Sequence, residues 1–270
     1  MAIQMPALPL HMLLRLLLVF ALLAGARSTW SASPLTICNE PGDGMPWMYW
    51  AHAPSQDGPR ELRGFSVDLW TVVFHRLQRE VRMVGDMPWK RCMRAVASGE
   101  IDFATGAYRD DERAKQFVYS RPYKVLTPQV FFRANKPVLI VTKADLKKYR
   151  GCGMNGSSYA HYGLKAEELD LGARSYRNLI EKLLRGRCDY FVEELEVIQQ
   201  LEGGRRHDLD DPALGHAPVP DAEAPALHLI AARDSAAAAL MPQIDAAVTE
   251  FYRSGEAMKL WKKHAGNLPY

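Results

Sequence analysis

The sequence predicts an α/β protein of two units, each a mainly parallel sheet flanked by helices, with two extended crossings between them. Short apolar runs alternate with amphipathic helical segments in both halves of the chain, which is typical of parallel sheets with right-handed crossovers. Two long extended runs, near residues 125–132 and 218–230, interrupt this alternation and connect the units. A length of 270 residues suits one large domain or two modest ones. We therefore expect a ligand site in the cleft between the units.

The first unit begins with the order strand, helix, strand. Leu35–Asn39 is predicted to be a short strand. Asp68 is predicted to open an amphipathic helix, because apolar residues recur three to four positions apart from Leu69 to Leu77. Val81–Val84 is predicted to be the second strand.

A second helix and a third strand complete this unit. Asp86 is placed as an N-cap, with Pro88 near the first helical position. Gly99 ends the helix at the position where glycine is favoured. Ile101–Ala104 is predicted to be a short buried strand that breaks at Thr105–Gly106.

The turn after this third strand carries the first functional signal. A short helix is predicted to open near Asp110, where the helix dipole favours negative charge. Arg113 lies in this first turn and does not fit that preference. It either binds an anionic ligand together with the helix N-terminus or only pairs with a neighbouring acid. The local sequence does not decide between these alternatives.

The second unit repeats the alternation. A short helix, a strand, a helix, a strand and a helix are predicted at 144–148, Gly151–Met154, Tyr176–Leu184, Cys188–Val192 and Glu194–Leu201.

The rest of the chain returns to the first unit. Prolines make residues 205–226 rich in turns, and Leu227–Ala232 is again extended. Residues 236–265 are predicted to be helical, with a break at Ser254–Gly255, and to pack back on the first unit.

Residues 1–26 are predicted to be a secretory signal peptide. They contain one positive charge, an apolar run of roughly ten residues and the small-residue ending Ala24–Ala26. Cleavage is expected after Ala26, and either Met1 or Met12 is the start. An uncleaved anchor is the alternative. The mature protein is therefore expected in the periplasm, without a membrane span.

The four cysteines, Cys38, Cys92, Cys152 and Cys188, suit an oxidising compartment. Three pairings are possible, and sequence does not choose among them. One disulfide in each unit is expected, with buried free thiols as the alternative. No CxxC spacing occurs, so neither a zinc site nor a thioredoxin-type site is expected. No other metal and no cofactor are expected either.

The composition excludes one class of partner. The chain is 48% hydrophobic and 24% charged, with a net charge of only +3 and acids and bases interspersed. This balance is too weak to indicate nucleic-acid binding.

A series of short motifs runs along the mature chain: Gly64–Leu69, Gly99–Asp102, Glu112–Arg113, Tyr119–Tyr123, Asn155–Ser158, Gly186–Asp189, Phe251–Gly255 and Leu260–Lys263. In this order they resemble the family 3 extracytoplasmic solute-binding proteins, the polar amino-acid-binding components of ABC importers. The resemblance implies a two-lobed periplasmic-binding-protein-like fold of type II. Lobe 1 would comprise residues 27–126 and 222–270, and lobe 2 residues 127–221.

The resemblance also implies residues that hold the ligand α-carboxylate. Arg113 matches the family arginine, and its planar fork of donors suits a carboxylate better than lysine would. In lobe 1 the same group would be bound by Thr105, Gly106 and Tyr108. In lobe 2 the matching turn consists of Asn155, Gly156, Ser157 and Ser158.

The remaining site residues follow from the same resemblance. Glu194 matches the acid that takes the ligand α-ammonium, with Glu193 as the adjacent possibility. Glu40 matches a position that often contacts the ligand side chain. The aromatic candidates for the pocket wall, each with a place in the core as the alternative, are Trp47, Phe65 and Trp89.

Three functions remain open. The first is a monomeric binding protein that delivers an amino acid to a membrane permease. The second is a periplasmic dehydratase-like enzyme of the same fold, for which Glu40, Glu193 and His161 are candidate acids or bases. The third is a sensor or accessory protein that binds its ligand without a permease.

Overall fold

The computed structural model describes residues 33–40, 46–51, 59–198, 201–202, 205–206, 209, 211–266, 268 and 270. The predicted signal peptide lies outside the described residues. Pro34–Tyr270 form one compact unit. Within the described part of the chain, no helix is both long and apolar enough to cross a membrane.

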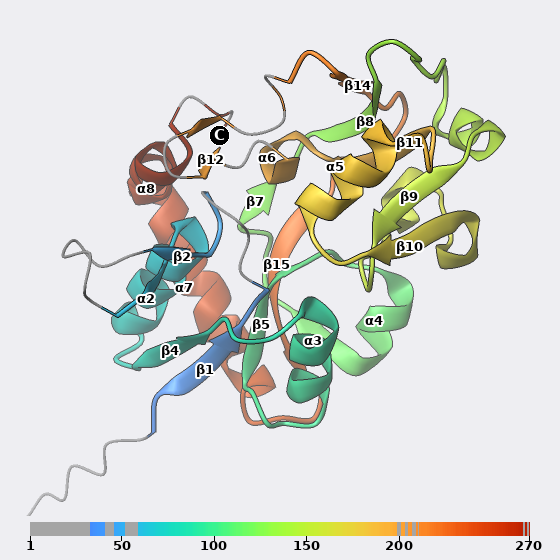
Figure 1. Cartoon of the computed structure of the whole chain (residues 1–270). Helices are drawn as coiled ribbons and strands as arrows, with labels where there is room; N and C mark the ends of the chain where they lie inside the picture. The colour runs from blue at the N-terminus through green and yellow to red at the C-terminus, as the bar shows by residue number, and fades with distance from the viewer. Residues whose placement is uncertain are drawn as a thin grey trace, which may run out of the picture. The chain divides into compact units, whose positions relative to one another are not determined.

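The first lobe is built on a six-stranded sheet (Figure 1). Strand β1 lies between β4 and β5 and is parallel to both, whereas β15 runs antiparallel to β5, β6 and β7. The strands are β1 (Leu35–Cys38), β4 (Val81–Val84), β5 (Phe103–Ala107), β6 (Phe117–Tyr119), β7 (Lys124–Val125) and β15 (Ala226–Ala232). A separate hairpin joins β2 (Tyr49–Ala51) and β3 (Glu61–Arg63).

Five helices accompany this sheet: α2 (Phe65–Arg76), α3 (Trp89–Ala97), α4 (Asp111–Gln116), α7 (Met241–Arg253) and α8 (Glu256–Ala265). The 3-10 turn η4 (Ala238–Leu240) precedes α7. Helix α2 buries Trp70 and Phe74, which share one core with Phe251 and Trp261 of α7 and α8. The C-terminal helices therefore pack back on the first lobe, as predicted.

The second lobe is built on a five-stranded sheet in the order β10-β9-β11-β8-β14. Its strands are β8 (Pro128–Arg133), β9 (Gly151–Met154), β10 (Leu169–Ala173), β11 (Tyr190–Glu194) and β14 (Leu214–Pro218). Its helices are α5 (Tyr176–Leu184) and α6 (Leu195–Ile198), with the 3-10 turns η1 (Lys143–Lys148), η2 (Ala160–Tyr162) and η3 (Ala166–Glu168). A short hairpin pairs β12 (Leu201–Glu202) with β13 (Arg205–Arg206).

The chain passes between the two sheets twice. The first passage lies between β7 and β8, and the second lies between β14 and β15. The two-lobed α/β fold is thus confirmed, while the residue boundaries of the lobes stay a prediction.

Each lobe contains one disulfide. Cys38 of β1 is bonded to Cys92 of α3, and Cys152 of β9 is bonded to Cys188, two residues before β11. The expected pair of bonds is confirmed, and of the three possible pairings the structure has this one. Both bonds tie a strand to the element that packs beside it.

Two predicted helix starts are wrong. Helix α2 begins at Phe65, with Gly64 at the N-cap, and not at Asp68. Asp68 lies in the first turn, where its carboxylate accepts hydrogen bonds from Lys263 (2.6 Å) and His264 (2.8 Å). Helix α3 is preceded by Pro88 as the N-cap residue, so the predicted cap at Asp86 is also wrong.

Strand boundaries in both lobes differ from the prediction. Strand β5 does not break at Thr105–Gly106 but continues to Ala107, because β15 pairs with it antiparallel across Thr105 and Ala107. The predicted helix from Glu194 to Leu201 is wrong, since Glu194 ends β11 and Leu201 belongs to β12. Of the described residues between them, Leu195–Ile198 form the short helix α6.

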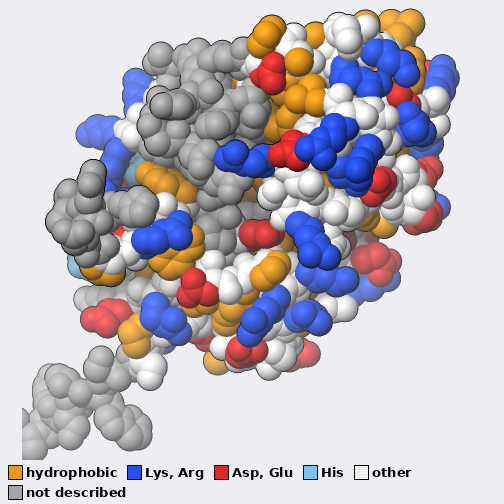
Figure 2. Space-filling view, viewed as in Figure 1, with side chains coloured by type: hydrophobic (Ala, Val, Ile, Leu, Met, Phe, Trp, Pro, Cys, Tyr) orange, Lys and Arg blue, Asp and Glu red, His pale blue; other side chains and the backbone are white. Residues whose placement is uncertain are grey.

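On the face shown in Figure 2, basic and acidic side chains of the described residues are interspersed. This distribution agrees with the small net charge and with the absence of a nucleic-acid-binding stripe on that face.

Candidate ligand-binding site

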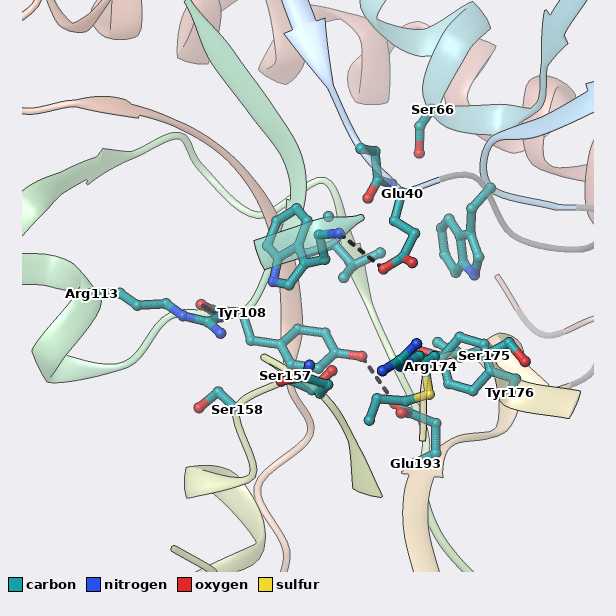
Figure 3. Close-up of a pocket in the computed structure, with 18 of the residues that line it drawn as sticks. Glu40, Ser66, Tyr108, Arg113, Ser157, Ser158, Arg174, Ser175, Tyr176 and Glu193 are labelled. Atoms are coloured by element: carbon teal, nitrogen blue, oxygen red, sulfur yellow. Dashed lines mark hydrogen bonds between the residues drawn. The ribbon is translucent and has the colours of Figure 1, made fainter. Parts of the chain in front are cut away.

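A cavity of about 160 Å³ is lined by residues that come from both lobes (Figure 3). This volume is close to that of an engineered cavity of about 150 Å³ that accepts benzene, so it suits a small solute. Nine residues predicted for the site line it: Glu40, Trp47, Trp89, Gly106, Tyr108, Arg113, Asn155, Ser157 and Ser158.

Arg113 reaches the cavity from α4. Asp110 caps this helix by accepting a hydrogen bond from the Arg113 backbone (2.8 Å), and its carboxylate also lies 3.3 Å from Arg113 Nε. The terminal nitrogens donate to the carbonyls of Tyr108 (3.4 Å) and, in the second lobe, Gly156 (3.0 Å). Arg113 therefore pairs with a neighbouring acid, Asp110, and also lines the cavity. Its binding of an anionic ligand stays a prediction.

Two adjacent glutamates at the end of β11 face Tyr108 of the first lobe. The Tyr108 hydroxyl donates to Glu194 and lies 3.4 Å from Glu193 Oε1. Glu194 is fully buried and also accepts from Tyr162 (3.1 Å), with His161 Nε2 at 2.9 Å. Glu193 is 3% exposed and lines the cavity.

The two carboxyl groups differ in charge. Burial, followed by the charge of Glu194, raises the pKa of Glu193 well above its usual value. Burial acts in the same direction on Glu194, but hydrogen bonds from Glu193 and His161 outweigh it and lower the pKa of Glu194 to about 2. The pair therefore shares one proton at pH values above the usual pKa of a glutamate, and Glu193 is the member that holds it.

The acid of the site is consequently one residue away from the predicted one. Glu194 does not line the cavity, whereas the adjacent Glu193 does. Both carboxyl groups reach the Tyr108 hydroxyl, but only Glu193 belongs to the cavity lining. Glu194 instead anchors Tyr108, Tyr162 and His161.

Three further predicted residues lie outside the cavity lining. The fully buried Thr105 hydroxyl accepts from Trp70 Nε1 (2.6 Å) and lies 3.0 Å from the hydroxyl of Tyr123, which does line the cavity. Phe65 is also fully buried and belongs to the first-lobe core. Gly156 contributes through its carbonyl, which accepts from Arg113.

Trp47 is held on the cavity wall from two sides. It packs against Phe65 and Trp261, with ring centroids 6.1 and 5.2 Å away, and its Nε1 donates to the Glu196 carbonyl (3.2 Å). Gly64 makes this placement possible, because a Cβ there would lie 2.0 Å from the Trp47 carbonyl oxygen. The φ of Gly64, +131°, is also one that other residues rarely adopt.

Glu40 is fixed at the start of α3. Its carboxylate accepts a hydrogen bond from the Trp89 backbone amide (3.0 Å) at the helix N-terminus, where negative charge is favoured. Glu40 and Trp89, which this hydrogen bond joins, both line the cavity.

A model of the bacterial extracellular solute-binding proteins, family 3, matches residues 50–267. The chain belongs to this family. The two-lobed fold and the cavity lined from both lobes agree with this membership.

Solved structures of similar fold include three amino-acid-binding proteins. ArtJ from the thermophilic bacterium Geobacillus stearothermophilus, described as arginine-, lysine- and histidine-binding, is 20% identical, with a TM-score of 0.69 over 88% of this chain and 97% of that one. A P235GK mutant of ArgBP from T. maritima is 19% identical, with a TM-score of 0.66 over 85% and 93%. AbpA from Streptococcus pneumoniae Canada MDR_19A, bound to L-arginine, is 22% identical, with a TM-score of 0.64 over 85% and 93%. A search of curated proteins finds no match to this chain.

Family membership supports the expectation of a binding protein and not an enzyme. Of the three candidate acids or bases of the dehydratase alternative, His161 lies outside the cavity lining and contacts Glu194. Across the described residues, no group of three or more His, Cys, Asp or Glu side chains is placed to hold a metal ion.

Ten further residues line the cavity of this solute-binding protein: Asn39, Ser66, Tyr123, Met154, Arg174, Ser175, Tyr176, Glu193, Val197 and Leu227. Glu193 was expected as the possibility adjacent to Glu194, and the other nine were not predicted for the site. Arg174, Ser175 and Tyr176 follow β10, a strand missing from the sequence prediction. For Ser175 a signal was present, since a serine directly before the predicted helix at Tyr176 is a good N-cap.

Proposed function

We propose that this protein captures an amino acid in the cavity between its lobes and delivers it to an ABC importer. Arg113 carries the proposal, because its guanidinium lines the cavity and is held by carbonyls of both lobes. Two of its five N–H donors remain for a ligand carboxylate once the three contacts to protein groups are made. The amino-acid ligands of the similar structures support the same class.

The carboxylate end of the ligand would lie between Arg113, Ser157 and Ser158. The serine hydroxyls add donors from the second lobe, so one carboxylate contacts both lobes. Contacts of this kind favour closure, since a ligand shifts a conformational equilibrium by its differential affinity for the two states.

The ammonium end would lie near Glu193. An ammonium beside this acid favours its ionised form and displaces the proton that Glu193 otherwise keeps. Binding is then coupled to proton release and strengthens as the pH rises. Glu40 is the second acid within the same cavity.

The wider assignments belong to the same proposal. Lobe 1 comprises residues 27–126 and 222–270, lobe 2 comprises residues 127–221, and residues 1–26 are a signal peptide that directs a monomer to the periplasm. A permease takes the ligand from the protein. The sensor or accessory role differs only in the partner.

A thermal-shift screen of purified residues 27–270 with the standard amino acids tests the function. We expect at least one amino acid to raise the melting temperature with the concentration dependence of mass action. Arg113→Ala should abolish the shift. Arg253→Ala, which removes an exposed arginine paired with Glu250, should keep it. The site assignment is wrong if Arg113→Ala binds normally, and the proposed function is wrong if ligands without a carboxylate are the only hits.

A further inference from the structure

The cavity contains a second arginine, Arg174, that forms no ion pair with any described acidic residue. Arg174 lies between β10 and the N-cap residue of α5 and lines the cavity. Among the described residues it has no hydrogen-bond or ion-pair partner, whereas Arg113 makes three side-chain contacts. Arg174 is solvent-exposed, so its charge carries little desolvation cost before a ligand arrives.

The two arginines come from different lobes. Arg113 belongs to α4 of the first lobe, and Arg174 follows β10 of the second. In the view of Figure 3 they enter from opposite sides, with Tyr108 between them. Each arginine can therefore bind a different group of one ligand.

Ser175 adds a donor at the Arg174 end. Its side-chain oxygen accepts a hydrogen bond from the backbone of Asn178 (3.1 Å), so its own hydroxyl hydrogen remains for another acceptor. A guanidinium beside a hydroxyl donor is suited to a carboxylate.

The charges of the lining favour the same ligand. Its charged residues are Arg113, Arg174, Glu40 and Glu193. Burial raises the pKa of Glu193, so its carboxyl group offsets the two arginines less than the carboxylate of Glu40 does. A ligand with a cationic side chain would bring a third positive charge near Arg174, and like charges placed together are strongly disfavoured.

We infer that the ligand carries two negatively charged groups, one bound by Arg113 and the other by Arg174 with Ser175, as in an amino acid with an acidic side chain. This inference rests on the proposed amino-acid function and specifies its ligand. It departs from the arginine named for the similar structures.

Calorimetric titration of the purified protein with L-glutamate, L-glutamine, L-arginine and glutarate tests the inference. Glutamine has nearly the shape of glutamate without its second charge, so glutamate should bind at least about tenfold more tightly. Arg174→Gln should weaken glutamate binding about tenfold or more and change glutamine binding less than about threefold. Because Arg174 is exposed and makes no hydrogen bond or ion pair with described residues, this variant should melt at the wild-type temperature.

Arg185→Gln is the matched control. Arg185 directly follows α5 and pairs with Glu181 at the surface. The substitution removes its positive charge. It should leave all four affinities unchanged.

The outcomes separate the two proposals. If glutamine or arginine binds as tightly as glutamate, or if Arg174→Gln keeps the preference, the inference is wrong and amino-acid binding stands. If only glutarate binds, the inference of two negatively charged ligand groups is kept, and the proposed amino-acid function is wrong. If none of the four binds, the inference is overturned, and the amino-acid screen above decides the function separately.

Discussion

Replacing Glu193 by glutamine should change how the stability of the protein depends on pH. Burial and the charge of Glu194 raise the pKa of Glu193 well above its usual value of 4.5. Above pH 4.5 the unfolded chain has lost this proton, while the folded protein keeps it. The stabilisation is therefore fully present below pH 4.5 and is lost as the pH rises toward the raised pKa. Glutamine resembles the protonated acid and cannot ionise, so the variant does not lose this stabilisation as the pH rises.

The magnitude follows from one proton. Where the folded state holds one proton more than the unfolded state, the free energy of unfolding falls by about 1.4 kcal/mol per pH unit. For a chain of this size, about 1 kcal/mol corresponds to about 2–4 °C in melting temperature. For each pH unit between the unfolded and the raised folded pKa of Glu193, the variant should therefore gain up to about 3–6 °C on the wild type. Glu194, with a pKa of about 2, stays charged over this range and does not contribute.

The assay is thermal unfolding of both proteins at matched ionic strength from pH 5 to 8, with the difference in melting temperature plotted against pH. Contributions of titrating groups that do not interact with Glu193 cancel in this difference. Glu181→Gln, which removes a half-exposed carboxylate paired with Arg185, should give a difference that does not vary with pH. A constant difference for Glu193→Gln would refute the shared proton.

Three further substitutions test other parts of the structure by thermal unfolding. Tyr108→Phe removes a hydroxyl that donates to a buried acid pair, so stability should fall by about 1.5–3 kcal/mol, and an unchanged melting temperature would contradict the contact. Replacing Cys38 and Cys92 together by serine opens a bond across 54 residues and should cost about 4 kcal/mol, and a loss below about 1 kcal/mol would count against this bond. Gly64→Ala forces a methyl group toward the Trp47 carbonyl and should destabilise by more than about 2 kcal/mol, whereas a neutral effect would exclude the tight turn.

The fold could be predicted from the sequence because most of its elements carry strong local signals. Helix α5 was predicted to the residue, since apolar positions recur with helical spacing and Gly186 follows with φ +72°. Strand β10 was missed because its sequence, Leu169–Ala173, contains aspartate and glycine, which are depleted in strands. Strand β14 was missed because it contains Pro218 and a glycine, residue types that are typical of turns. Proline is nevertheless accepted in an edge strand such as β14.

A residue of the site could be predicted from the sequence where its charge is unusual for its position in a helix. Arg113 was singled out because a cation in the first turn of a helix opposes the dipole, and the structure places it in the cavity. Which of Glu193 and Glu194 lines the cavity depends on how β11 is oriented in the folded protein. Tertiary packing alone determines this orientation. Arg174 has no local signal, because one arginine between a strand and a helix is ordinary until the other lobe is in place.

The contacts that join the lobes involve the same residues that line the cavity. Arg113 donates to the Gly156 carbonyl, and Tyr108 donates to the acid pair of the second lobe. These contacts are made by protein groups alone, so part of the free energy that holds the lobes together is independent of any ligand. The apparent affinity of a protein is its intrinsic affinity reduced by the fraction of molecules in the binding-competent state. Residues such as Tyr108 therefore set ligand affinity through the population of that state, in addition to any direct contact with the ligand.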